Sequence, residues 1–125
     1  MSIATTLGTL IKANAALQEL ATYKMTGKAG YDASRFIAKA QDALEAYNKA
    51  KQASVEKYGV FDEKAGGYRF LTESAIKAAQ ADEADLSATE VVFEVSKLTF
   101  EALEKMNPTV GLWAWLDWAI EPPKV

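Results

Sequence analysis

Carboxylates are the side chains of this sequence best suited to chemistry, because its 125 residues include no histidine and no cysteine. The absence of both residue types excludes Ser-His-Asp triads, Cys-His nucleophiles and the usual structural zinc sites. The best carboxylate pair is Glu90 with Glu94, which would share one face of a strand. At the rise of a strand they lie about 13 Å apart, farther than the carboxylates of an inverting glycosidase. We therefore expect no catalytic residues and a protein that is not an enzyme.

A second acidic group, Asp82, Glu83 and Asp85, offers the oxygen ligands that hard cations prefer. Its spacing lacks the pattern and the glycine of an EF-hand loop, so we interpret it as the solvated face of a helix. Residues 64–67 hold a lysine and two glycines but lack the spacing of a phosphate-binding loop, and they indicate a turn. We expect no metal site and no cofactor.

One short segment, Gly27-Lys28-Ala29-Gly30, matches the GxxG loop with which KH domains hold a nucleic-acid backbone between two helices. The basic residues that would serve such a site are Lys24, Lys28 and Arg35. A net charge of −3 and a pI near 5.0 give no counterion-release contribution to nucleic-acid binding. A KH domain would also have a strand before its first helix, so we interpret the segment as a helix–helix linker.

All three tryptophans of the chain, Trp113, Trp115 and Trp118, lie in one predicted helix over residues 107–120. An Asn-Pro pair would start this helix and a Pro-Pro pair would end it. At 100° per residue, Trp113 lies on the side of the predicted helix that faces the core. Trp115 and Trp118 lie outside that side and extend the apolar surface around the helix. Two interpretations stay open: the three rings complete a small core, or they form a binding surface for another protein or a second copy.

Two long amphipathic helices are predicted at the start of the chain. The first covers residues 2–23, with Ser2 as its cap, and the second covers residues 33–57, with Asp32 as its cap. The short Gly-containing break between them indicates an antiparallel helical hairpin. Asn14 lies within the first apolar stripe, where it either fixes the helix register from inside or lies at the margin. The apolar stripe of the second helix is Phe36, Ile37, Ala40, Leu44, Tyr47 and Val55.

The pattern changes to strands after Gly59. Residues 60–71 predict a β-hairpin with a polar Gly-Gly loop, and Thr72 is placed to cap a helix over residues 73–86. Residues 89–95 alternate between apolar and polar side chains, which predicts a strand that joins the hairpin in one small antiparallel sheet. A short helix over residues 99–105 then precedes the tryptophan helix.

The expected fold class is therefore α+β and mostly helical, in a single domain over residues 1–125. An N-terminal antiparallel helical hairpin (1–59) precedes a β-hairpin, a helix and a strand (60–95), and short C-terminal helices (96–125) follow. With 50% hydrophobic residues, a chain of this length can bury a real core. The longest apolar stretch, residues 110–120, is too short to cross a bilayer, and the start of the chain has no signal-peptide pattern. We expect a protein inside the cell and away from membranes.

Taken together, the layout resembles a family of small uncharacterised proteins encoded by bacteriophages and prophages. The matching segments are Leu10-Ile11, Leu17-Gln18-Glu19-Leu20-Ala21, Glu45-Ala46-Tyr47, Glu56-Lys57-Tyr58-Gly59, residues 62–67, Asp85-Leu86-Ser87-Ala88-Thr89-Glu90-Val91 and residues 112–121. Trp113, Trp115 and the linker at residues 27–30 depart from the pattern of that family. The resemblance implies a phage setting and supplies no catalytic residues.

Three functional hypotheses follow. The first is a non-enzymatic phage protein that binds another protein, of the host or of the phage, as an inhibitor of a host factor or as an assembly accessory. Its candidate binding residues are Trp113, Trp115 and Trp118. The second is a virion component built by self-association through the helical hairpin. A homodimer is the alternative to a partner of another kind. The third is a nucleic-acid binder. The first and third place the protein in the cytoplasm of the host cell, and the second places it in the virion.

Overall fold

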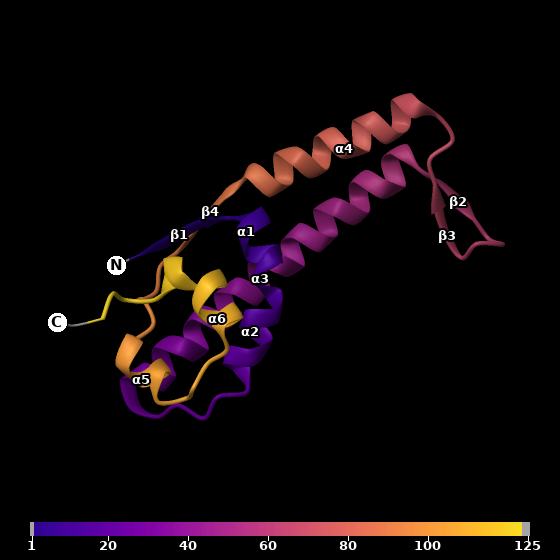
Figure 1. Cartoon of the computed structure of the whole chain (residues 1–125). Coiled ribbons are helices and arrows are strands. Elements are labelled where there is room, and N and C mark those ends of the chain that lie inside the picture. The colour runs from indigo at the N-terminus through magenta and orange to yellow at the C-terminus, as the bar shows by residue number, and fades with distance from the viewer. Residues whose placement is uncertain (1, 124–125) are drawn as a thin grey trace.

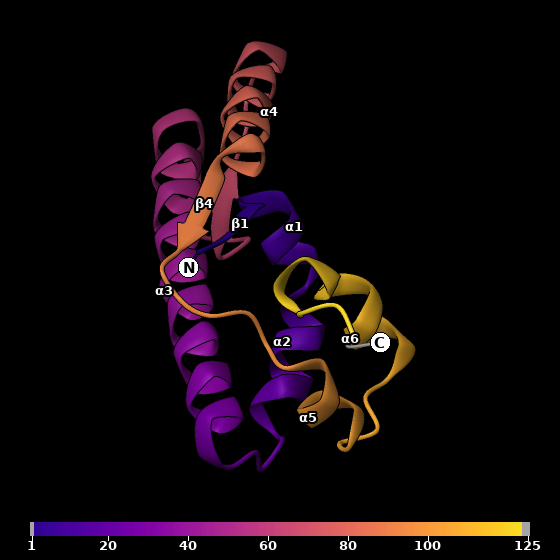
Figure 2. The same ribbon diagram turned by 90° about the vertical axis from the view of Figure 1, so that its left-hand side faces the viewer.

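Helix α3, Gly27–Tyr58, sets the length of the molecule. Its 32 residues span about 48 Å at a rise of 1.5 Å per residue. The segment contains no proline, and its two glycines lie in the first turn, so nothing interrupts the helix before Gly59. In the computed structural model, which describes residues 2–123, α3 runs along most of the height of the molecule, and α4 extends beyond its upper end (Figure 2).

The first half of α3 lies inside a body that is built from the two ends of the chain (Figure 1). Helices α1, Leu7–Lys12, and α2, Asn14–Ala21, pack on it, and the 3₁₀ helix η1, Asp117–Ala119, reaches it through the contact of Trp118 with Phe36. Helix α6, Val110–Trp115, packs on α2, and α5, Phe100–Glu104, contributes Leu103 to the same core. These elements share one apolar core, whose largest fully buried side chains are Phe36, Ile3, Leu10, Leu20, Leu98, Leu103, Leu112 and Leu116.

The second half of α3 leaves the body and forms an arm, defined here as residues 47–88 (Figure 1). Helix α4, Glu73–Ala88, runs back beside it, and strands β2, Val60–Asp62, and β3, Gly67–Arg69, form an antiparallel hairpin at the far end. The predicted β-hairpin and third helix are thus confirmed, as is the mostly helical α+β class. The predicted cap also holds, since the Thr72 hydroxyl accepts a hydrogen bond from the Ala75 amide at 3.0 Å.

Strand β4, Glu90–Phe93, is present where the alternating pattern predicts it, but its partner is not the β-hairpin. It pairs with β1, Ile3–Thr6, in a separate two-stranded antiparallel sheet, with Ile3 opposite Phe93. The expectation of a single sheet was wrong because α4 carries the chain about 24 Å back toward the body before β4 begins.

The predicted helix over residues 2–23 was wrong as one element, since it is a strand and two short helices. Thr6 caps α1, and its hydroxyl accepts a hydrogen bond from the Thr9 amide at 3.2 Å. Ala13, with φ −83° and ψ 1°, separates α1 from α2 while its side chain stays fully buried in the core. Asn14 is exposed, which confirms the interpretation that it lies at the margin of the apolar stripe.

The predicted start of the second helix at residue 33 was also wrong, because α3 begins at Gly27. Asp32 is not its cap: the carboxylate is buried within the helix and accepts a charged hydrogen bond from Lys28 Nζ at 2.7 Å. Gly30 allows the preceding loop to cross the first turn, since a Cβ there would lie 2.4 Å from the Met25 carbonyl oxygen.

The N-terminal helical hairpin is consequently not a clear unit of the fold. Helices α1 and α2 cover only the first half of α3, while α4 packs along the second half (Figures 1 and 2). Residues 27–32, by which α3 starts earlier than predicted, do not change this, because they lie at the end of α3 that is in the body.

The C-terminal tryptophan segment was predicted as one helix and is two. Asn107 has φ 52° and does not cap it; the cap is Thr109, whose hydroxyl accepts a hydrogen bond from the Leu112 amide at 3.2 Å. Helix α6 ends before Leu116, and the Trp115 carbonyl accepts its hydrogen bond from the Trp118 indole at 2.7 Å. The Trp118 side chain thus donates to a carbonyl oxygen that, in a continuous helix, would accept a hydrogen bond from a backbone amide. The predicted short helix before it is confirmed as α5.

Phe36 provides a test of the core. Its side chain is fully buried, with its ring edge-on to Phe93 at 6.0 Å and to Trp118 at 5.6 Å between centroids. Phe36→Ala should lower the free energy of unfolding by about 3–5 kcal/mol, because it leaves a cavity where three elements meet. Val110→Ala, at a side chain that is 83% exposed, is the control and should change it little. A loss below about 1 kcal/mol for Phe36→Ala, measured by urea denaturation, would contradict this core.

Candidate functional site

The candidate acid–base pair does not form a site. Glu90 and Glu94 are both exposed, at the start of β4 and just after its end. Within residues 2–123 no group of three or more acidic side chains is arranged to hold a metal ion.

Two of the three acids in the group Asp82, Glu83 and Asp85 face α3 instead of solvent. Asp82 accepts a hydrogen bond from the Ser54 hydroxyl at 2.9 Å, and Glu83 accepts one from the Tyr47 hydroxyl. Asp85 is exposed. The interpretation of this group as a solvated face is thus correct only for Asp85, and the other two acids hold the two helices of the arm together.

The Tyr47 hydroxyl is the most perturbed group of the arm. Burial raises the pKa of Tyr47 to about 12, and the hydrogen bond to Glu83 and the negative charge of that carboxylate act in the same direction. The phenol is therefore protonated at neutral pH and donates its hydrogen bond to Glu83.

A similar pair lies in the body, where it connects α2 to the start of α6. Glu19 accepts hydrogen bonds from the Tyr23 hydroxyl, from the Thr109 hydroxyl at 2.6 Å and from the Thr109 amide at 3.0 Å. Burial by itself would raise the pKa of Glu19, but these hydrogen bonds outweigh it and hold the pKa below its ordinary value. Burial and the same carboxylate raise the pKa of Tyr23 to about 12. This carboxylate, too, has a structural role.

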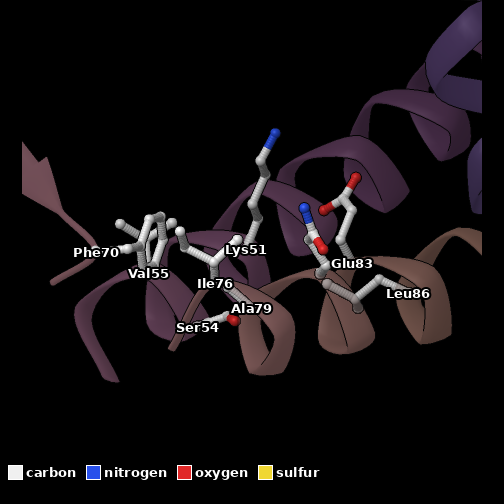
Figure 3. A pocket seen from close by; sticks show the side chains of 9 residues that line it. Lys51, Ser54, Val55, Phe70, Ile76, Ala79, Glu83 and Leu86 are labelled. Carbon is white, nitrogen blue, oxygen red and sulfur yellow. The ribbon is translucent and has the colours of Figure 1, made fainter. Parts of the chain in front are cut away.

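A groove of about 320 Å³ runs between α3 and α4 along the arm (Figure 3). We call it the arm groove. Its apolar lining comes from Val55 of α3, from Phe70 after β3, and from Ile76 and Leu86 of α4. The charged side chains Lys51, from α3, and Glu83, from α4, line it as well, so the groove joins an apolar floor to one charge of each sign.

The far end of the arm exposes apolar side chains. Among residues 2–123 nine large hydrophobic side chains are exposed, and five of them lie on the arm. Four of these form what we call the tip patch: Val60 (52% exposed), Phe61 (56%), Tyr68 (36%) and Leu71 (64%). The rings of Phe61 and Tyr68 pack edge to face at 5.5 Å across the hairpin. Such a concentration on one small hairpin is unusual for a surface that meets only water.

The three tryptophans do not share one environment. Trp118 is half-buried against Phe36, and Trp113 is half-buried against Phe100, with ring centroids 5.1 Å apart. Trp115 is 43% exposed. The structure therefore places one of the three predicted binding residues on the surface and the other two against the core.

The basic residues proposed for nucleic-acid binding are exposed, and two of them, Lys28 and Arg35, line one pocket on the surface. The acids Asp32 and Glu94 line the same pocket, so it carries both signs of charge. Lys28 pairs with Asp32, and the Arg35 guanidinium lies over the Tyr31 ring, 5.9 Å from its centroid. The third residue, Lys24, lies in the loop before α3. The GxxG segment forms the first turn of α3 and not a loop between helices.

Sequence reasoning missed both surfaces of the arm. Tyr47 and Val55 are in the predicted apolar stripe, and Phe61 and Tyr68 are in the predicted hairpin. The available signal was the alanine-rich and acidic composition of residues 73–88, which gives α4 little apolar surface with which to cover its neighbours.

Comparison of the chain with protein-family models, with curated proteins and with solved structures finds no match. None of the helices within residues 2–123 combines the length and the apolar character needed to cross a bilayer.

The two perturbed tyrosines give a spectroscopic prediction. Absorbance titration of the folded protein should show a late tyrosine ionisation near pH 12 with the amplitude of two residues. The amplitude of this late step should fall to that of one residue in Tyr47→Phe or in Tyr23→Phe, and the step should be absent in the double variant. Because folding raises both pKa values, their contribution to stability is fully present below pH 10 and is lost as the pH rises through 12. An unchanged late step in Tyr47→Phe would contradict the Glu83 contact.

Metal removal gives a second prediction. Excess EDTA should leave the melting temperature unchanged, because a ligand stabilises a fold only if the folded state binds it. A clear drop in melting temperature that one added cation reverses would contradict this, and variants of Asp82, Glu83 and Asp85 would then locate the site.

Proposed function

We propose that this chain is a non-enzymatic protein that binds another protein, and that it does so through the tip patch of the arm. The observation that carries the proposal is the exposure of Val60, Phe61, Tyr68 and Leu71 at the end of an arm that projects from the body. Apolar side chains in such a position lose the most water-exposed surface when a partner covers them.

The absence of histidine and cysteine supports a role without catalysis. Four carboxylates that are withdrawn from water in part or in full accept hydrogen bonds from neighbouring groups and so serve the fold: Glu19, Asp32, Asp82 and Glu83. The phage setting comes from the resemblance described above, and with it the partner is a host factor that is inhibited or a phage protein that is assembled. On this proposal the protein acts inside the infected cell.

The test compares capture of partners by matched variants. A tagged chain expressed in a bacterial host should enrich a partner that mass spectrometry identifies, and Phe61→Ser with Tyr68→Ser should abolish that enrichment. Each ring at the centre of an interface contributes about 2 kcal/mol or more, so the double variant should lose binding completely at cellular concentrations. Both side chains are exposed, so the fold should persist in circular dichroism.

Two controls separate the tip patch from other surfaces. Val92→Ser changes an equally exposed side chain of the body and should leave capture intact. Trp115→Ala tests the tryptophan surface. If Trp115→Ala alone removes the partner while the tip variant retains it, the binding surface belongs to α6 and the proposal for the tip patch is wrong.

A further inference from the structure

We infer that the arm groove is occupied by the arm groove of a second copy of this chain, so that two arms pair about a two-fold axis that runs along them. The inference rests on the proposed function of protein binding and names one partner. It concerns a different surface from the tip patch, since the groove lies between α3 and α4 and the patch lies on the hairpin.

The arm by itself is a single layer of two helices, and the arm groove lies on one of its two faces. None of the residues of α4 is buried, and Ile76, in the lining of the groove, is 40% exposed. In the body, by contrast, α3 is covered by helices from both ends of the chain. Apolar side chains on the face of a two-helix layer are buried only when another layer packs on that face. A second pair of helices would supply this layer and complete a four-helix bundle.

The charged side chains Lys51 and Glu83 at the groove favour a second copy of this chain as its occupant. Lys51 and Glu83 stand on opposite walls, one on α3 and one on α4, and Figure 3 shows both side chains extending to the same side of the apolar floor. Within residues 2–123 Lys51 has no ion-pair partner, and its ammonium group lies 6.0 Å from the centre of the Tyr47 ring.

The two charges also lie at the same level of the arm. The ring of Tyr47 is beside Lys51, and its hydroxyl donates to Glu83. A two-fold axis along the arm places α3 of one copy over α4 of the other, and therefore sets Lys51 of each copy beside Glu83 of the other. A symmetric interface must be complementary to itself, and this pair of opposite charges meets that condition twice.

Charge reversal tests the pairing. The wild-type protein should sediment as a dimer, with twice the chain mass of 13.6 kDa, at micromolar concentration. Lys51→Glu and Glu83→Lys should each weaken dimerisation by about tenfold or more, because each sets like charges together at both symmetric positions. An equimolar mixture of the two variants should form a heterodimer, since one variant carries two negative charges in the groove and the other two positive charges.

Two further variants complete the design. Lys49→Glu makes the same charge change on an exposed face of α3 outside the groove and should leave the dimer intact. Ile76→Ser removes apolar surface from the groove and should give a folded monomer. Variants are checked by circular dichroism, so that an unfolded arm is not mistaken for a lost contact.

The outcomes are decisive in both directions. A wild-type monomer up to high micromolar concentration overturns the inference, as do single variants that dimerise like wild type or a mixture that forms no heterodimer. A monomer that captures a helix of another protein through Ile76 also overturns it and assigns the groove to that partner. Phe61→Ser with Tyr68→Ser should remain dimeric, so loss of partner capture in that variant and loss of the dimer are separate results.

Discussion

The uninterrupted length of α3 is the constraint on which the rest of the structure depends. The helix is about 48 Å long, whereas the short helices from the two ends of the chain cover only its first half. The remaining half would expose Tyr47 and Val55 to water, so α4 must return along it. The arm, the hairpin at its end and the separate β1–β4 sheet all follow from that mismatch in length.

The body and the arm use different interactions to hold their helices. In the body, leucine and phenylalanine side chains fill a closed core around Phe36. In the arm, α4 supplies alanines and acids, and its contacts with α3 include hydrogen bonds from Tyr47 and Ser54. A hydrogen bond contributes about 1 kcal/mol net, which is less than a buried leucine contributes. The arm is therefore the less stable part of the molecule.

The local pattern of the sequence predicts most of the elements but not how they pair. The hairpin near Gly66, the Thr72 cap and the alternation in β4 are each short-range signals, and each is present in the structure. Pairing of β4 with β1 depends on where α4 delivers the chain, which no local pattern contains.

The surfaces of the arm were beyond sequence reasoning for a related reason. An apolar stripe indicates that a helix is covered, but it does not say how much of each side chain is covered. The exposure of Ile76 depends on how closely α3 and α4 pack, which the stripe does not contain. The tryptophan segment shows the reverse case, in which two conspicuous side chains, Trp113 and Trp118, are held against the core.

The pairing of chain ends in the body has a consequence for the order of folding. The contact between Glu19 and Thr109 closes a loop of 90 residues, and β1 with β4 closes one of similar length. Closing so long a loop from an unfolded chain is entropically unfavourable and slow. The contacts of the α3–α4 arm close shorter loops, of 36 residues for Tyr47 with Glu83 and 28 for Ser54 with Asp82. If the arm forms first, residues 47 and 88 come close together, and the loop that remains to be closed is shorter. On this order of folding the arm, in which no residue of α4 is buried, would be the element that brings the two ends of the body within reach of each other.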